Sequence, residues 1–211
     1  MITEYERETI PGLPGQLPQG ERILWQGKPE WRALARTAFH TRGIAIYFAV
    51  LTAVALGFAV TGGGFTGVVM TSALGVAGVA LLHLLAWGTA RTTIYTLTDR
   101  RIVLRIGMAL PKCINLPLAK VGAVEIKLNA DGSGDLPIAV TERQKLGYPV
   151  LWPHARAWHV SKPQPMLRAV PDAASVGALI ARHCLAAHPG GALSTVSQPA
   201  ATPSMTGALA A

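Results

Sequence analysis

The sequence predicts a membrane α-helical hairpin joined to a small α+β domain, in which a barrel-like sheet or sandwich is closed by a helix near the C-terminus. Two observations carry this prediction. No Lys, Arg, Asp or Glu occurs from residue 43 to residue 90, which is long enough for two membrane-spanning helices. From residue 91 onward, short stretches with alternating apolar residues precede one amphipathic stretch, a pattern typical of strands followed by a helix.

The uncharged stretch divides into two spans at the glycine-rich residues 61–67. We expect the spans to cover residues 43–60 and 68–87, because eighteen helical residues reach about 27 Å, close to the hydrocarbon thickness of a bilayer. Neither span has the polar stripe of a soluble amphipathic helix. Residues 43–90 are therefore predicted to form a transmembrane hairpin, with a buried pair of soluble helices as the alternative.

Basic residues beside the hairpin predict its orientation. They are Lys28, Arg32, Arg36 and Arg42 before it and Arg91, Arg100, Arg101 and Arg105 after it. The loop between the spans carries no charge. The positive-inside rule therefore places both termini in the cytoplasm.

The rest of the chain divides into four parts. Residues 1–20 are expected to be flexible, residues 21–42 to contribute a strand to the later domain, residues 91–188 to form that domain, and the uncharged tail 189–211 to be disordered. The expected strands cover residues 91–97, 101–106, 113–118, 121–128, 136–140 and 165–170. The closing helix is expected to start near Pro171 and Asp172 and to end before Pro189.

Composition excludes several functions. A net charge of +8 with only 14% charged residues suits a cytoplasmic face held against anionic lipid headgroups. The basic residues are dispersed, which argues against a nucleic-acid partner. No G-x-S-x-G, P-loop, H-E-x-x-H or C-x-x-C motif occurs, so we expect neither an enzyme nor a metal site. Cys113 and Cys184 are expected to be free thiols, because the cytoplasm is reducing.

Two features of the spans are candidate contact sites. Small residues recur every fourth position of the first span, at Ala45, Ala49, Ala53 and Gly57. Such a face lets another helix backbone approach closely, either within the hairpin or from a foreign transmembrane helix. In the second span, His83 is expected to make an interhelical hydrogen bond, with partner contact or ligation of a bacteriochlorophyll magnesium as alternatives. No other cofactor is expected.

Some segments resemble known families. Residues 95–107 are similar to the opening hairpin of bacterial PH-like domains, and residues 21–29 to the strand that precedes the membrane hairpin in such proteins. Residues 151–158, with 162–168, resemble the PuhB family of photosynthetic complex assembly proteins from purple phototrophic bacteria. The resemblance implies a multi-pass protein of the bacterial inner (intracytoplasmic) membrane, a dimer, that assists assembly of the reaction centre and core antenna.

The domain contains two further sets of candidate residues. Trp152, His154, Arg156 and Trp158 are residue types that often anchor interfaces, so we expect them to dock reaction-centre subunits or core antenna polypeptides, with burial in the core as the alternative. Arg100, Arg101 and Arg105 are expected to contact membrane lipids, with a solvated strand face as the alternative. A lipid- or envelope-sensing PH-like protein unrelated to photosynthesis, or a membrane enzyme acting on lipid, remains open.

Overall fold

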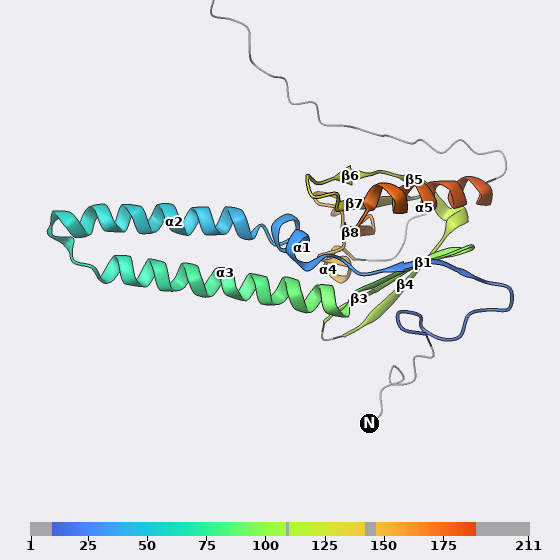
Figure 1. Cartoon of the computed structure of the whole chain (residues 1–211), viewed down its shortest axis with the longest axis horizontal. Helices are drawn as coiled ribbons and strands as arrows, with labels where there is room; N and C mark the ends of the chain where they lie inside the picture. Colours follow the sequence, from blue (N-terminus) through green and yellow to red (C-terminus); the bar gives the residue numbers. More distant parts are fainter. Residues whose placement is uncertain (1–9, 109, 142–146, 189–211) are drawn as a thin grey trace, which may run out of the picture.

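A computed structural model of the chain describes residues 10–108, 110–141 and 147–188. Two long antiparallel helices project from a domain of strands and shorter helices (Figure 1). The helices are α2 (Thr41–Phe58), extended by the π-helical turn η2 (Ala59–Gly63), and α3 (Thr66–Thr92). Gly62 and Gly64 in the turn between them have φ of 100° and 76°, which glycine adopts without steric cost.

Both long helices are apolar and almost entirely uncovered by the rest of the chain. By length and composition each is able to cross a membrane, and only 6% of its most apolar window is buried. A core helix of a soluble protein would be mostly buried. The described part of the chain therefore leaves the apolar surface of both helices uncovered.

The first sheet is an antiparallel meander interrupted by the long helices. Its order is β1-β2-β3-β4, formed by β1 (Ile23–Gly27), β2 (Ile94–Thr98), β3 (Arg101–Ile106) and β4 (Lys112–Pro117). Gly27 pairs with Tyr95 and Gln26 with Thr96. Because β1 and β2 are neighbours, the two long helices occupy the connection between two paired strands.

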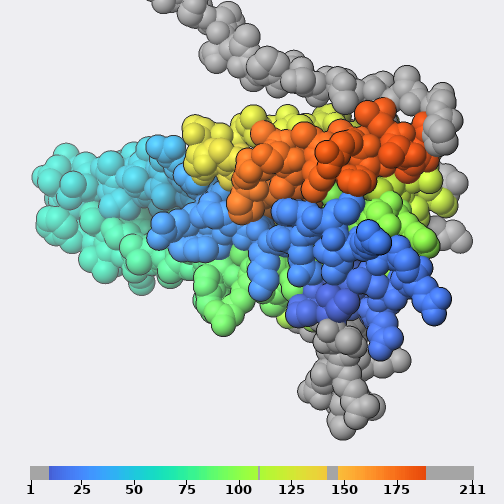
Figure 2. Space-filling model, turned by 45° about the vertical axis from the view of Figure 1, so that its right-hand side comes forward, coloured from blue at the N-terminus to red at the C-terminus, as the bar shows by residue number. Residues whose placement is uncertain are grey.

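The second sheet and the closing helix complete the domain. The strands are β5 (Val121–Val124), β6 (Lys127–Leu128), β7 (Gly134–Val140) and β8 (Met166–Val170), in the order β5-β7-β6 with β8 also on β7. The short helices are η3 (Leu118–Lys120) and α4 (Tyr148–Leu151), and α5 (Ala173–Ala187) runs along the outside (Figure 2). Both sheets and α5 share one core, in which Leu104, Ile138 and Ile180 are fully buried.

A short helix joins the long helices to the domain. Helix α1 (Trp31–Thr37) begins where the Glu30 carboxylate accepts a hydrogen bond from the Ala33 amide at 3.0 Å, while the Glu30 amide donates to Ala169 of β8 at 2.8 Å. Leu34 of α1 packs with Ala86 and Ala90 of α3 in a second hydrophobic cluster. This cluster fixes the base of α3 to the domain.

The structure corrects several expected boundaries. Helix α1 was not expected, and the strand expected from residue 91 begins only at Ile94, because the last turn of α3 packs on α1. The strand expected over 121–128 is divided into β5 and β6. The interruption lies opposite Pro137 of β7, which has no N–H to donate to the ladder.

Part of the N-terminal segment contacts the domain. Leu13 is buried, and the Pro11 carbonyl accepts a hydrogen bond from Gln26 Nε2 at 2.8 Å. Gly12 lies beside Ile94 of β2, whereas most of residues 14–20 are exposed. Residues 1–9 and the expected disordered tail 189–211 lie outside the described residues.

Candidate functional site: a lateral groove and a charged cavity

The small-residue face of α2 borders an open groove. Ala45, Ala49 and Ala53 line a groove of about 750 Å³ between α2 and α3, together with Gly75 and Ala80 of α3 and larger neighbours. All three alanines are exposed. The face predicted for helix docking is therefore available to another apolar helix.

The contact between α2 and α3 uses a neighbouring face. Phe48 lies so close to Gly75 that an added Cβ there would be 2.7 Å from the Phe48 Cβ, and the Thr52 hydroxyl donates to the Thr71 hydroxyl at 3.4 Å. Gly57, the last residue of the small face, is exposed and has no atom within 4 Å of a Cβ position. Packing within the hairpin does not account for this face.

His83 does not make the expected interhelical bond. Its Nδ1 donates to the Val79 carbonyl at 2.8 Å, one turn earlier in the same helix, because that acceptor lies directly within reach. The ring contacts Trp31 of α1 edge-on, with centroids 6.4 Å apart. With Nδ1 protonated, Nε2 carries the lone pair. Ligation of a pigment by this nitrogen stays a prediction.

The three arginines expected at the membrane surface lie in different environments. Arg101 makes two bonds to the buried Glu21 carboxylate, at 2.8 and 3.1 Å. Arg100 and Arg101 adjoin the β2–β3 turn, at the end of β2 farthest from α3, whereas Arg105 lies opposite Ile94 beside α3. Arg100 and Arg101 therefore lie farther along β2 from the long helices than Arg105 does, and a lipid contact of these arginines stays a prediction.

His154 belongs to the core and not to a docking surface. It is fully buried, with Nδ1 2.9 Å from the Tyr95 hydroxyl and Nε2 3.2 Å from the Thr93 hydroxyl. Burial, and secondarily the charge of Arg168, lower the pKa of His154 to about 3. Burial also raises the pKa of Tyr95. The ring is therefore neutral, and the expectation that it docks a partner is wrong because its polar atoms already have internal partners.

The other three residues of that segment differ among themselves. Arg156 pairs with Glu125 at 2.7 Å and donates to Gln164 at 3.1 Å. Trp152 is half exposed and meets Phe39 edge-on, with centroids 5.4 Å apart. Trp158 is 95% exposed. Only the two tryptophans therefore remain as surface anchors.

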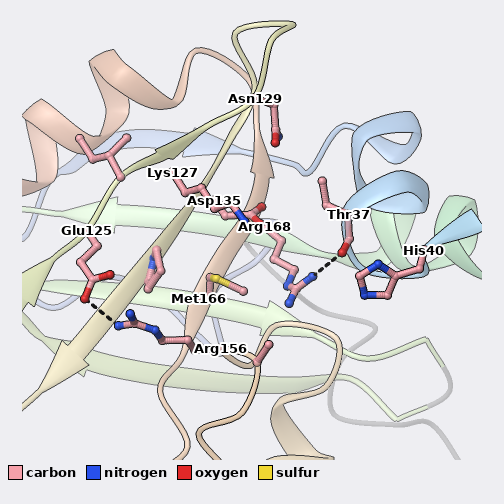
Figure 3. A pocket seen from close by; sticks show the side chains of 12 residues that line it. Thr37, His40, Glu125, Lys127, Asn129, Asp135, Arg156, Met166 and Arg168 are labelled. Carbon is pink, nitrogen blue, oxygen red and sulfur yellow. Dashed lines mark hydrogen bonds and ion pairs between the residues drawn. The ribbon is translucent and has the colours of Figure 1, made fainter. Parts of the chain in front are cut away.

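A charged cavity of about 680 Å³ lies where α1 ends beside the second sheet (Figure 3). Thr37 and His40 form one wall, and Lys127, Asp135 and Arg168 belong to β6, β7 and β8. The guanidinium of Arg168 and the His40 ring face the same space. Sequence reasoning did not find this cavity; its signal was a single arginine within the apolar strand β8.

The Cys184 thiol and the Asp131 carboxyl, both outside this cavity, have shifted pKa values. Cys113 and Cys184 are not joined by a disulfide, and burial raises the pKa of Cys184 to about 11, which keeps it protonated. Within the described ranges, no three His, Cys, Asp or Glu side chains are grouped as a metal would need. Asp131 binds Arg36 of α1, and the Ser133 hydroxyl, followed by Arg36, holds the pKa of Asp131 below its usual range.

Comparison with known proteins defines the class. Residues 36–184 match the Bacterial PH domain family, and the chain belongs to this family. A relative from Rhodobacter capsulatus, described as an uncharacterized 23.7 kDa protein in the puhA 5' region, is 37% identical over 184 residues, covering 84% of this chain and 86% of that protein. No solved structure matches the chain. The name of the relative gives the position of its gene and no activity.

Proposed function

We propose that this chain is a non-catalytic assembly factor for the photosynthetic reaction centre and core light-harvesting complex. The observation that carries the proposal is the exposed small-residue face of α2, which borders an apolar groove that the hairpin leaves unfilled. The position of the relative's gene beside puhA supports the link to photosynthesis. In this proposal, reaction-centre subunits and core antenna polypeptides are the partners.

The proposal places α2 and α3 across the bacterial inner (intracytoplasmic) membrane, with both termini in the cytoplasm. Support comes from the apolar, uncovered surfaces of both helices and from the basic residues at their domain end. Trp87 and Arg91 near the end of α3 stack with the guanidinium 5.3 Å from the ring. Tryptophan and arginine together are typical of a membrane–water interface.

The lipid contact of the domain is assigned to apolar residues beside this interface. Met108 reaches α3, since a Cβ on Gly88 would lie 2.8 Å from its sulfur, and both Met108 and Leu110 are exposed. Of the arginines first considered, Arg105 alone is near enough to join them. The domain thus rests on the membrane through the β3–β4 connection.

A docking role agrees with the way the acidic side chains are used. Glu21, Glu125 and Asp131 each pair with an arginine inside the fold, so they are poorly placed as general acids or bases. We therefore assign a binding role and not a catalytic one to the chain. Nucleic acid is not among the proposed partners. Dimerisation is part of the proposal through the family resemblance.

The test uses Ala53→Leu combined with Gly57→Leu in a phototrophic host. Added bulk on the small face would separate two helix backbones, so recovery of reaction-centre subunits with the tagged protein should fall several-fold. Val54→Leu with Phe58→Leu is the matched control, because both residues are exposed on a neighbouring face. Equal recovery from both double variants would overturn the groove as the docking site, and failure of the wild type to recover any subunit would overturn the assembly role.

A lipid- or envelope-sensing protein is the second candidate. The charged cavity beside the start of α2 favours it. Normal assembly of the core complex after deletion of the gene, together with an altered response to membrane lipid composition, would support this candidate against the first.

A further inference from the structure

Arg168 is a half-buried cation that has no carboxylate partner among the described residues. Its side chain makes two bonds, both to main-chain carbonyls, from Nη1 to Thr37 at 3.4 Å and from Nη2 to Ala155 at 3.3 Å. Its Nε is buried and has no acceptor. Among the described residues no carboxylate lies within ion-pair distance of it. A guanidinium offers five N–H donors, so much of its capacity is unused.

Other arginines of the domain show the contrast. Arg36 binds Asp131, Arg101 binds Glu21, and Arg156 binds Glu125. Figure 3 shows Arg156 and Arg168 in the same cavity, the first bonded to the Glu125 carboxylate and the second to the Thr37 carbonyl. Among the described residues, these three arginines therefore have carboxylate partners and Arg168 has none.

The cavity around Arg168 has the size and charge for a small anion. Its volume of about 680 Å³ falls within the usual range of ligand sites. Once the Glu125–Arg156 pair is set aside, the charged groups on its walls are Arg168, Lys127 and Asp135. Oδ1 of Asp135 already accepts a hydrogen bond from the Ala169 amide at 2.9 Å. Two cations and one carboxylate, which already accepts a hydrogen bond, give the cavity walls a net positive charge.

The cavity lies at the depth of lipid headgroups if α2 enters the membrane as proposed. His40 on its wall is one turn before Ile44, whose amide donates to the His40 carbonyl at 3.2 Å. One helical turn is about 5.4 Å, and the headgroup layer is roughly 5–8 Å thick on each side of a bilayer. This step rests on the membrane placement of the proposed function.

We propose that this cavity binds a phosphate group, with Arg168 as its principal ligand. A guanidinium holds two phosphate oxygens through parallel N–H···O bonds, a geometry that its two long carbonyl contacts do not provide. Lys127 and the His40 ring line the same cavity, where they provide further hydrogen-bond donors to the phosphate. The phosphodiester of an anionic phospholipid and free inorganic phosphate share this chemistry, and the position of His40 favours the lipid.

The test measures binding to the purified full-length chain in a neutral detergent. The probes are dihexanoyl phosphatidylglycerol, dihexanoyl phosphatidylcholine and inorganic phosphate, titrated by calorimetry. We expect saturable binding of phosphatidylglycerol, weakened about tenfold or more in Arg168→Gln, because a charge-assisted hydrogen-bonded pair is lost. Arg168→Lys should be intermediate. Arg100→Gln, which removes the same charge from an exposed turn, should bind as the wild type does.

The titrations with the different probes and variants distinguish the possible outcomes. Tighter binding of phosphatidylglycerol than of inorganic phosphate identifies a lipid site, and equal or tighter binding of inorganic phosphate identifies a soluble anion as the ligand. Equal affinities in Arg168→Gln and Arg100→Gln, or no saturable binding of either anion, would overturn the site.

A second measurement serves if Arg168→Gln does not fold, as judged by circular dichroism. The wild-type protein is reconstituted into nanodiscs that contain a phosphatidylglycerol with a photoactivatable headgroup. After illumination, the crosslinked peptides are mapped by mass spectrometry. Labelling of peptides that contain His40, Lys127 or Arg168 supports the site, and labelling confined to the lipid-facing sides of α2 and α3 overturns it. Neither measurement uses a photosynthetic partner. A negative result would therefore overturn the phosphate site without overturning the proposed assembly role.

Discussion

The long helices and the domain use their residues in opposite ways. In the helices, the residues predicted to be functional are exposed and touch little, as at Ala53 and Gly57. In the domain, His154 and Arg101 looked functional in the sequence but hold the fold together through internal partners. The difference teaches that His154 and Arg101 of the domain serve the fold, whereas the small residues on the exposed face of α2 have no packing role in the described structure.

The largest effect expected from this comparison concerns topology. We expect Cys introduced at Gly64 to react with an impermeant maleimide from the periplasmic side, and Cys introduced at Asp131 to react only after the inner membrane is opened. The opposite labelling pattern would show that the apolar helices are inserted the other way. Equal labelling of both sites in sealed cells would show that they do not span the membrane.

The next effect concerns the buried network of the domain. His154→Ala should lower the free energy of unfolding by about 3 kcal/mol, because the Tyr95 and Thr93 hydroxyls lose a buried partner and a cavity forms. Thermal unfolding in detergent measures this loss of stability. Trp158→Ala, four residues away and exposed, should change stability by less than about 0.5 kcal/mol. Similar losses in both variants would contradict the assignment of His154 to the core.

A smaller effect is expected at the contact between the long helices. Gly75→Leu should destabilise the α2–α3 contact by about 2 kcal/mol, because the new side chain overlaps Phe48. Cysteines replacing Thr52 and Thr71 report the contact by disulfide formation, which should become several-fold less efficient. Gly57→Leu is the control and should leave crosslinking unchanged. If Gly75→Leu crosslinks as well as this control, the helices pack through another face.

The smallest effect, compared over a single pH unit, is a dependence of stability on pH. The pKa of His154 is about 3 in the fold and near 6.5 when unfolded, so the unfolded chain binds the extra proton between these values. Stability contributed by the neutral ring is fully present above pH 6.5 and is lost as the pH falls, by at most about 1.4 kcal/mol per unit. His154→Gln should remove this slope. An unchanged slope in that variant would assign the dependence to other groups.

The sequence predicted the elements whose signal is long or periodic. The two apolar helices, the β3 and β4 strands and α5 follow from local patterns. Helix α1 is only seven residues long and is specified by its packing on α3, which no local pattern reveals. The division of residues 121–128 depends on Pro137 in another strand.

The candidate sites were predicted unevenly for the same reason. The small residues of α2 were found from their spacing in the sequence, and in the structure Ala45, Ala49 and Ala53 line the groove between α2 and α3. The partners of His154 are about sixty residues away in sequence, at Thr93 and Tyr95. The cavity at Arg168 brings together residues from α1, β6, β7 and β8, so only the fold reveals it.

The join between α3 and β2 has a mechanical consequence. Thr93 alone separates them, and its amide still donates to the Thr89 carbonyl at 3.0 Å, while its hydroxyl contacts His154. Between Gly88 and Gly107 the chain contains neither glycine nor proline. The helix and the strand therefore act as one rigid lever without a hinge. If α3 crosses the membrane as proposed, a partner that tilts α3 would turn the β1–β4 sheet with it, and Arg100 at the far turn would move farthest.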